Sequence, residues 1–189
     1  MLKQLFVLLF KLIAESTPTW KRLAEKQDKD NEDFYKSYFF PVVGIIALLS
    51  FAGILTATKT FDVQTALKTV IKQVMIYGGS FYIISYVLSD YIFPRYGLEK
   101  DKWLAERFTG YSSSLVYAVA MVKALFPSLF LLEILVFYTI YIIWTGAAQF
   151  LKINEDLLIK FTIFAGIIIL FTPFLLNVLI NLLMPGMRI

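Results

Sequence analysis

Residues 111–151 read YSSSLVYAVAMVKALFPSLFLLEILVFYTIYIIWTGAAQFL and decide the fold class of this 189-residue chain. The stretch contains two formal charges, Lys123 and Glu133, with Pro127 between them. One helix needs about 20 apolar residues to cross a hydrocarbon core of roughly 30 Å, so this stretch is long enough for two helices. We therefore predict a membrane hairpin that turns near Pro127 and carries one cation and one anion close to its tip.

The composition of the whole chain supports a membrane protein. Hydrophobic residues make up 59% of the chain and charged residues 17%, whereas soluble domains are about 45–50% apolar and about 25% charged. Several apolar runs exceed the length of a buried core helix. No polar segment is long enough to bury a core of its own. We therefore expect one all-α, polytopic membrane domain.

Residue types that are absent restrict the chemistry. The chain has no cysteine and no histidine, which excludes disulfides, thiolate nucleophiles and the common zinc, haem and iron–sulfur ligand sets. It also lacks a Walker-type loop, an HExxH motif, a nucleophile elbow and paired aspartates in a spanning helix. We expect no catalytic residues, no metal and no cofactor. The net charge of +4 reports orientation in a membrane protein, so we expect no nucleic-acid partner.

Hydrophobic segments predict a five-helix transmembrane bundle at residues 38–189, preceded by a cytoplasmic segment at 1–37. The five spans are expected at about 38–58, 73–92, 110–126, 128–150 and 161–183. Asp62 is expected to cap a helix that begins near Val63, and Asn154 to cap the last helix. Small residues recur on one face of the first span at Ala47, Ser50, Gly53 and Ala57. They favour a helix–helix seam, with a ligand groove as the alternative.

The N-terminal segment predicts an amphipathic helix over residues 1–15. Its apolar face, at 100° per residue, consists of Leu2, Leu5, Phe6, Leu9, Leu12 and Ile13. A secretory signal is apolar all round and ends in small residues, so we interpret this segment as an interfacial helix lying in the headgroup plane. Packing of the same face against protein is a compatible alternative. Trp20, Lys21 and Arg22 follow, and we expect them to contact anionic lipid or a partner.

The distribution of basic residues predicts the orientation. Thirteen of the 18 Lys and Arg residues lie in the N-terminal segment and in the loops after the second and fourth spans. The positive-inside rule therefore puts the N-terminus in the cytoplasm and the C-terminus outside. In the loop after the second span, residues 99–108 predict a short amphipathic helix with Trp103 as one of its membrane anchors.

Five short motifs follow one another along the chain. They are Thr17-Pro18-Thr19-Trp20, Pro41 at the start of the first span, Gly110-Tyr111, Trp144-Thr145-Gly146 and Lys152-Ile153-Asn154-Glu155-Asp156. Their order resembles that of the Yip family, the Ypt/Rab-interacting membrane proteins, in its bacterial form. The resemblance covers essentially the whole chain and implies five spans with a cytoplasmic N-terminus.

The chain departs from that family in two places. It lacks the acidic-aromatic proline motif of the eukaryotic members. In the family a proline commonly follows the Gly-Tyr pair within about one turn, whereas here the next proline after Gly110-Tyr111 is Pro127. The Rab-related role of the eukaryotic members is therefore not expected here. The resemblance implies a protein of the bacterial cytoplasmic (inner) membrane.

Four polar residues in the predicted spans are candidate functional residues. An ionisable residue at mid-membrane costs about 2.5–3.5 kcal/mol on insertion scales. Lys123 and Glu133 therefore predict a paired or proton-linked site that lines a cavity; in the alternative, Lys123 extends to the headgroups and Glu133 bonds within the bundle. Asn177 and Asn181 share a helix face and are expected to bond across helices.

Two functions from different classes fit these observations. The first is a non-enzymatic adaptor that organises membrane or binds lipids or proteins through its cytoplasmic face, at residues 1–36 and 94–110. The alternative is a small-solute or ion transporter or channel, acting as a homo-oligomer, that uses Lys123 and Glu133. Kinks are expected at Gly78-Gly79, Pro127 and Pro173, and transporters place binding sites where helices are broken.

Overall fold

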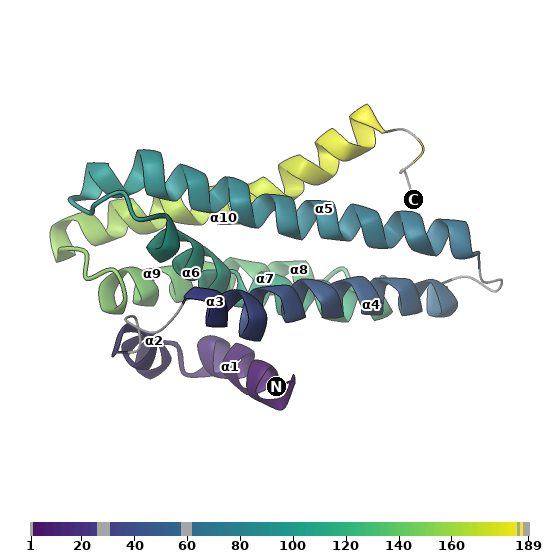
Figure 1. Ribbon diagram of the computed structural model, residues 1–189, viewed down its shortest axis with the longest axis horizontal. Helices are drawn as coiled ribbons and strands as arrows, with labels where there is room; N and C mark the ends of the chain where they lie inside the picture. The colour runs from purple at the N-terminus through teal and green to yellow at the C-terminus, as the bar shows by residue number, and fades with distance from the viewer. Residues whose placement is uncertain (1, 26–30, 58–61, 185, 187–189) are drawn as a thin grey trace.

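The computed structural model describes residues 2–25, 31–57, 62–184 and 186, and every regular element in these ranges is helical. The long helices run side by side in an elongated bundle (Figure 1). Helices long and apolar enough to cross a membrane, among the described residues, are Tyr35–Ile54, Val63–Tyr96, Leu132–Gln149 and Glu155–Leu183. The all-α class is confirmed, and these four helices are those of an integral membrane protein.

The first two predicted spans are present. A short helix, α3 (Asn31–Phe34), leads through a π-helical segment, η1 (Tyr35–Phe39), into α4 (Phe40–Ala57). Residue 58, the predicted end of the span, lies outside the described residues. Pro41 falls in the first turn of α4, where its missing N–H has no helical partner to lose.

The second long helix begins where its cap predicts. The Asp62 carboxylate accepts hydrogen bonds from the backbone N–H groups of Gln64 and Thr65, both at 3.1 Å, and α5 (Val63–Val87) follows. A π-helical segment, η2 (Leu88–Ile92), and a 3₁₀ turn, η3 (Phe93–Tyr96), continue it. Gly97, at φ 76°, ends it, because glycine takes this left-handed conformation without a Cβ clash.

The third predicted span differs from the structure. The segment consists of α6 (Lys102–Ser112) and α7 (Ser114–Leu125), so Gly110-Tyr111 lies inside a helix rather than at its start. Ser113 alone separates the two, and the bonds Ser113 N–H to Thr109 O (3.0 Å) and Tyr117 N–H to Ser113 O (2.9 Å) carry the helical pattern across it. Alone, α7 covers about 18 Å at 1.5 Å per residue. The helix thus begins at Lys102, eight residues earlier than predicted.

The fourth predicted span, at residues 128–150, is shorter in the structure, where the candidate membrane helix covers Leu132–Gln149. Residues 126–131 form turns, followed by α8 (Leu132–Leu135), the 3₁₀ segment η4 (Val136–Tyr138) and α9 (Thr139–Gln149). The last helix, α10 (Glu155–Leu183), begins six residues before the predicted span and contains Pro173. Asn154 occupies its N-cap position, but the side chain makes no capping hydrogen bond, so the predicted side-chain cap is wrong.

The N-terminal helices α1 (Leu2–Ala14) and α2 (Ser16–Glu25) pack against the bundle. Leu5, Leu9 and Leu12 of α1 are buried, whereas Leu2 and Phe6 of the same predicted face are exposed. Only part of the predicted apolar face therefore packs against protein. The exposed part is the surface that an interfacial position would place in lipid.

The core divides into two adjoining clusters. One surrounds Trp20, Phe108 and Phe161 where α2, α6, α9 and α10 meet, and the other surrounds Phe34, Tyr38 and Phe81 where η1, α4, α5 and α7 meet. In the first cluster the Trp20 and Phe108 ring centroids lie 5.8 Å apart. In the second, Phe39 stacks on Phe81 at 3.9 Å. Both clusters lie toward the end of the bundle where α4 begins and α5 ends.

Candidate functional site

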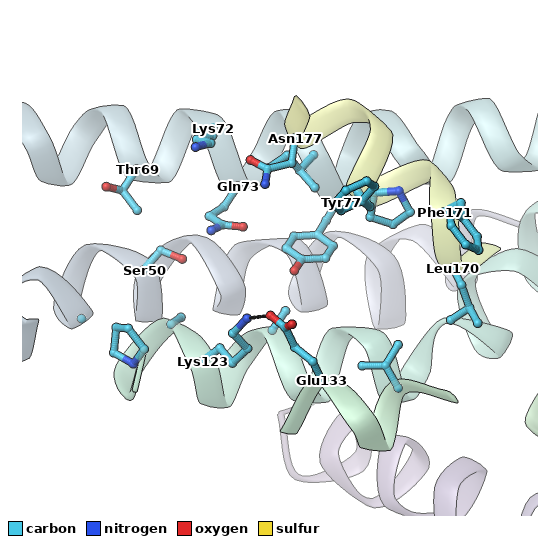
Figure 2. A pocket seen from close by; sticks show the side chains of 18 of the residues that line it. Ser50, Thr69, Lys72, Gln73, Tyr77, Lys123, Glu133, Leu170, Phe171 and Asn177 are labelled. Atoms are coloured by element: carbon cyan, nitrogen blue, oxygen red, sulfur yellow. Dashed lines mark hydrogen bonds and ion pairs between the residues drawn. The ribbon is translucent and has the colours of Figure 1, made fainter. Parts of the chain in front are cut away.

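The opposite end of the bundle, where α4 ends and α5 begins, contains a cavity of about 900 Å³. Residues of α4, α5, α7, α8, η4 and α10 line it (Figure 2). Its polar lining consists of Ser50, Thr69, Lys72, Gln73, Tyr77, Lys123, Glu133 and Asn177. A cavity of this size accommodates a small molecule or part of a lipid.

Lys123 and Glu133 form an ion pair on the cavity wall (Figure 2). Lys123 comes from the last turn of α7 and Glu133 from α8, and the turn around Pro127 brings the two together. Their side chains are 31% and 64% exposed, respectively, so the pair borders open space rather than dry core. The two side chains are thus paired and border a cavity, as the first of the two predicted arrangements has them, and a proton-linked role for the pair stays a prediction.

A second polar group bridges α5 and α10. Lys72 Nζ donates to Asn181 Oδ1 at 2.8 Å, and Asn181 Nδ2 donates to Asn177 Oδ1 at 3.4 Å. The predicted bonding of the asparagines across helices is thereby confirmed for Asn181. Lys72 was not among the candidate residues, since its position one helical turn after Lys68 carries no sign of the contact with α10.

Tyr77 reaches across the cavity from α5, and its ring points toward the Lys123–Glu133 pair (Figure 2). Gln73, one turn earlier on the same helix, also points into the cavity. The polar side chains of α5 therefore face the ion pair on α7 and α8. Neither residue was a candidate from sequence, since neither is charged and Gln73 directly follows another polar residue of α5.

The rest of the lining is apolar and reaches the outer surface of the bundle. Phe137, Phe171 and Phe174 line the cavity and are 61–66% exposed. Pro173 lies between the last two and removes one backbone hydrogen bond of α10. The cavity is therefore amphipathic, with charged groups on α5, α7 and α8 and aromatic rings on η4 and α10.

The predicted seam of small residues meets α7 at Gly53 and also borders the cavity. A Cβ added to Gly53 would lie 1.7 Å from the backbone oxygen of Ala124, so α4 and α7 approach as closely there as glycine permits. Ser50 and Gly53 also line the cavity. The Ser50 hydroxyl is buried and, among the described residues, has no hydrogen-bond partner. The side chain of Ala57 lies outside the described part of the chain.

The lipid contact predicted for Trp20 is wrong. Its side chain is fully buried, and its Nε1–H donates to the Ile142 carbonyl at 3.1 Å. Gly146 makes room for the ring, since a Cβ at that position would lie 2.7 Å from it. The neighbouring Lys21 and Arg22 are exposed. An aromatic residue beside two cations resembles a membrane anchor in sequence, but here its ring is buried in the hydrophobic core of the bundle.

Trp103 remains a surface residue. It is 49% exposed and packs edge-on against Tyr35, with ring centroids 6.2 Å apart. Glu106, one turn later on α6, was not a candidate from sequence. Its carboxylate is buried and lies 3.8 Å from the Lys102 ammonium. Trp103, Lys102 and Glu106 all lie at the end of the bundle away from the cavity.

The chain was compared with models of protein families, with curated proteins and with solved structures, and none of the three comparisons finds a match. The site is therefore interpreted from its own chemistry. Among the described residues, no three His, Cys, Asp or Glu side chains are placed to hold a metal ion. The cavity combines two ammonium groups, one carboxylate and an aromatic wall, a set suited to holding an amphiphilic molecule.

Proposed function

We propose that this chain is a non-enzymatic, lipid-binding integral membrane protein of the Yip type, with membrane organisation as its role. One observation carries the proposal: a cavity of about 900 Å³ with charged groups on one side and exposed phenylalanines on the other. Ionisable residues inside a transmembrane bundle face a cavity or another protein group. An amphiphile from the surrounding bilayer matches both halves of this lining.

The proposed threading has five crossings, with the N-terminus in the cytoplasm, in a bacterial inner membrane. The third crossing is made by α6 and α7 together, which hydrogen bonds across Ser113 support. Exposed Lys and Arg residues at the cytoplasmic end support the orientation, as the positive-inside rule requires; they are Lys21, Arg22, Arg95, Lys100, Lys102, Lys152 and Lys160. The cavity then lies in the outer half of the bundle.

The cytoplasmic face is the proposed surface for further contacts. Lys21 and Arg22 are exposed next to α1, whose Phe6 and Phe10 are exposed as well. Cations beside exposed aromatic residues suit an interfacial helix on anionic lipid. Trp103 is available on the same face for lipid or for a protein partner. Self-association is part of the proposal, with the long exposed face of α10 as the surface available for it.

Lipid binding is tested by obstructing the cavity. Fluorescent phosphatidylcholine and phosphatidylglycerol are titrated separately into the purified full-length chain in detergent. The double variant Thr69→Trp/Ala120→Phe places two large rings in the lining and is expected to weaken binding of the better ligand about tenfold. The matched control is Val74→Trp/Ala118→Phe, on the same two helices but outside the lining. Equal binding by both variants, or no saturable binding by the wild type, contradicts the proposal.

A transporter is the second candidate, and the Lys123–Glu133 pair is the observation that favours it. A charge pair that borders open space near a proline-broken helix is a common element of coupling sites. Ion and proton flux into liposomes containing the full-length chain provides the test, with Glu133→Gln as the variant. Gradient-driven flux that Glu133→Gln abolishes supports transport. Absence of flux under every gradient leaves lipid binding as the function.

A further inference from the structure

We propose that the cavity selects an anionic phospholipid and that the Lys72 ammonium recognises the phosphate of its headgroup. This inference rests on the proposed lipid-binding function and adds the class of ligand and the residue that selects it. Its basis is the charge balance of the cavity, the shape of its lining and one buried hydroxyl.

The lining carries one positive charge without a counter-ion. Glu133 neutralises Lys123. Lys72 has no carboxylate within ion-pair distance among the described residues, and its hydrogen-bond partner is the neutral amide oxygen of Asn181, at 2.8 Å. An ammonium group in a low-dielectric site gains most from an anion. Lys72 therefore supplies the site with a preference for a negatively charged ligand.

The shape of the lining favours a lipid over a free anion. The cavity wall includes Phe171 and Phe174 on α10 as well as Lys72, and these phenylalanines are 61% and 63% exposed. A free phosphate gains no binding energy from such an apolar surface, whereas an acyl chain packs against it. Headgroup and chain of one molecule thus match the two parts of the site.

Ser50 provides a second donor for the headgroup. Ser50 is one of the lining residues, and its buried hydroxyl has no partner among the described residues. A buried polar group without a partner is destabilising unless a ligand or a water molecule satisfies it. The amide of Gln73, which points into the same space (Figure 2), adds donors of the kind that phosphate oxygens accept.

The experiment compares dioleoyl-phosphatidylglycerol with dioleoyl-phosphatidylcholine, bound to the full-length chain in detergent and counted by native mass spectrometry. The wild type is expected to prefer phosphatidylglycerol about tenfold. Lys72→Gln should reduce this preference to about twofold or less, and Lys72→Arg should retain it. The matched control is Lys68→Gln, one turn earlier on α5 and outside the lining, which should behave like the wild type.

Several results would overturn the inference. Equal binding of the two lipids by the wild type, or an unchanged preference in Lys72→Gln, removes headgroup selection by Lys72. Lipid binding that the cavity-obstructing double variant still weakens would leave the proposed function standing in that case. Displacement of phosphatidylglycerol by inorganic phosphate alone, at equal concentration, would identify a free anion as the ligand. A melting temperature within about 3 °C of the wild type confirms that Lys72→Gln is folded.

Discussion

The two ends of the bundle are built from the same kinds of residues and differ in packing. At the cytoplasmic end, as proposed here, Gly146 admits the ring of Trp20, and aromatic side chains fill the space between helices. At the other end, Gly53 admits the backbone of α7, yet a cavity of about 900 Å³ remains beside it. Close helix approach thus produces a filled core in one place and the wall of a binding site in the other. The comparison indicates a stable framework at one end and a site at the other.

The largest expected effect comes from removing the central ring of the packed end. Trp20→Ala deletes a fully buried side chain together with its hydrogen bond to Ile142 O. We expect a loss of about 3–5 kcal/mol in the free energy of unfolding, measured by denaturation in mixed micelles. Trp103→Ala, at a half-exposed position, is the control and should lose less than about 1.5 kcal/mol. Equal losses would show that the buried Trp20 contributes no more to stability than the half-exposed Trp103.

The next effect concerns the contact between α4 and α7. Gly53→Ala places a Cβ against the backbone of Ala124, which cannot move aside as a flexible side chain can. We expect a loss of about 1–3 kcal/mol in the free energy of unfolding. Gly44→Ala, on the same helix with open space around it, is the control and should be neutral or stabilising by up to about 1 kcal/mol. No loss of stability in Gly53→Ala would mean that α4 and α7 can move apart at the cavity end to accommodate the added methyl group.

A smaller effect is expected for the ion pair in the cavity. Glu133→Gln and Lys123→Met, made singly and together, form a double-mutant cycle. Both side chains are partly exposed, so solvent or headgroups screen them, and the coupling energy should be about 0.5–1 kcal/mol. Thermal unfolding of the four proteins gives this value. Additive effects of the two substitutions would remove the pairing as a feature of the site.

The smallest effect is that of the cap of α5 and its dependence on pH. The hydrogen bond from the Thr65 hydroxyl, followed by those from the Thr65 and Gln64 N–H groups, lowers the pKa of Asp62 below its usual value of 3.8. The ionised cap therefore stabilises the folded chain above that value, and this stabilisation is lost as the pH falls through the lower folded-state pKa. Melting temperatures of wild type and Asp62→Asn should differ slightly at pH 7 and converge as the pH falls below 3.8. A constant difference across this range would exclude ionisation of Asp62 as the cause.

Sequence analysis identified the long apolar helices because their signal is local. Apolar length, Asp62 before Val63, and proline in a first turn each act within one segment. The third span was predicted to begin at Gly110-Tyr111, after a separate short amphipathic helix at residues 99–108. In the structure α6 runs from Lys102 to Ser112 with Glu106 and Arg107 buried, so no break separates the two predicted elements at Gly110.

The site was predicted only where charge made it conspicuous. Lys123 and Glu133 stand alone in an apolar stretch, and a proline turn between them makes their meeting predictable. Lys72 and Asn181 lie 109 positions apart, and no local pattern reports that α5 and α10 adjoin. The prediction for Trp20 was wrong for the converse reason. Its neighbours in sequence are cations, which suggest a surface position, whereas its burial depends on Gly146 and Phe108, far along the chain.

Pro173 determines which part of the cavity is able to change shape. On one side, α4 and α7 are already in backbone contact at Gly53, and α5 packs along α4, so this side is incompressible. On the other side, the proline leaves the Ile169 carbonyl without its helical donor, and bending α10 there breaks no backbone hydrogen bond. The turn of α10 at Pro173 is thus the part of the cavity wall with a helical hydrogen bond already missing. For the proposed lipid we expect entry from the bilayer on this side of the cavity.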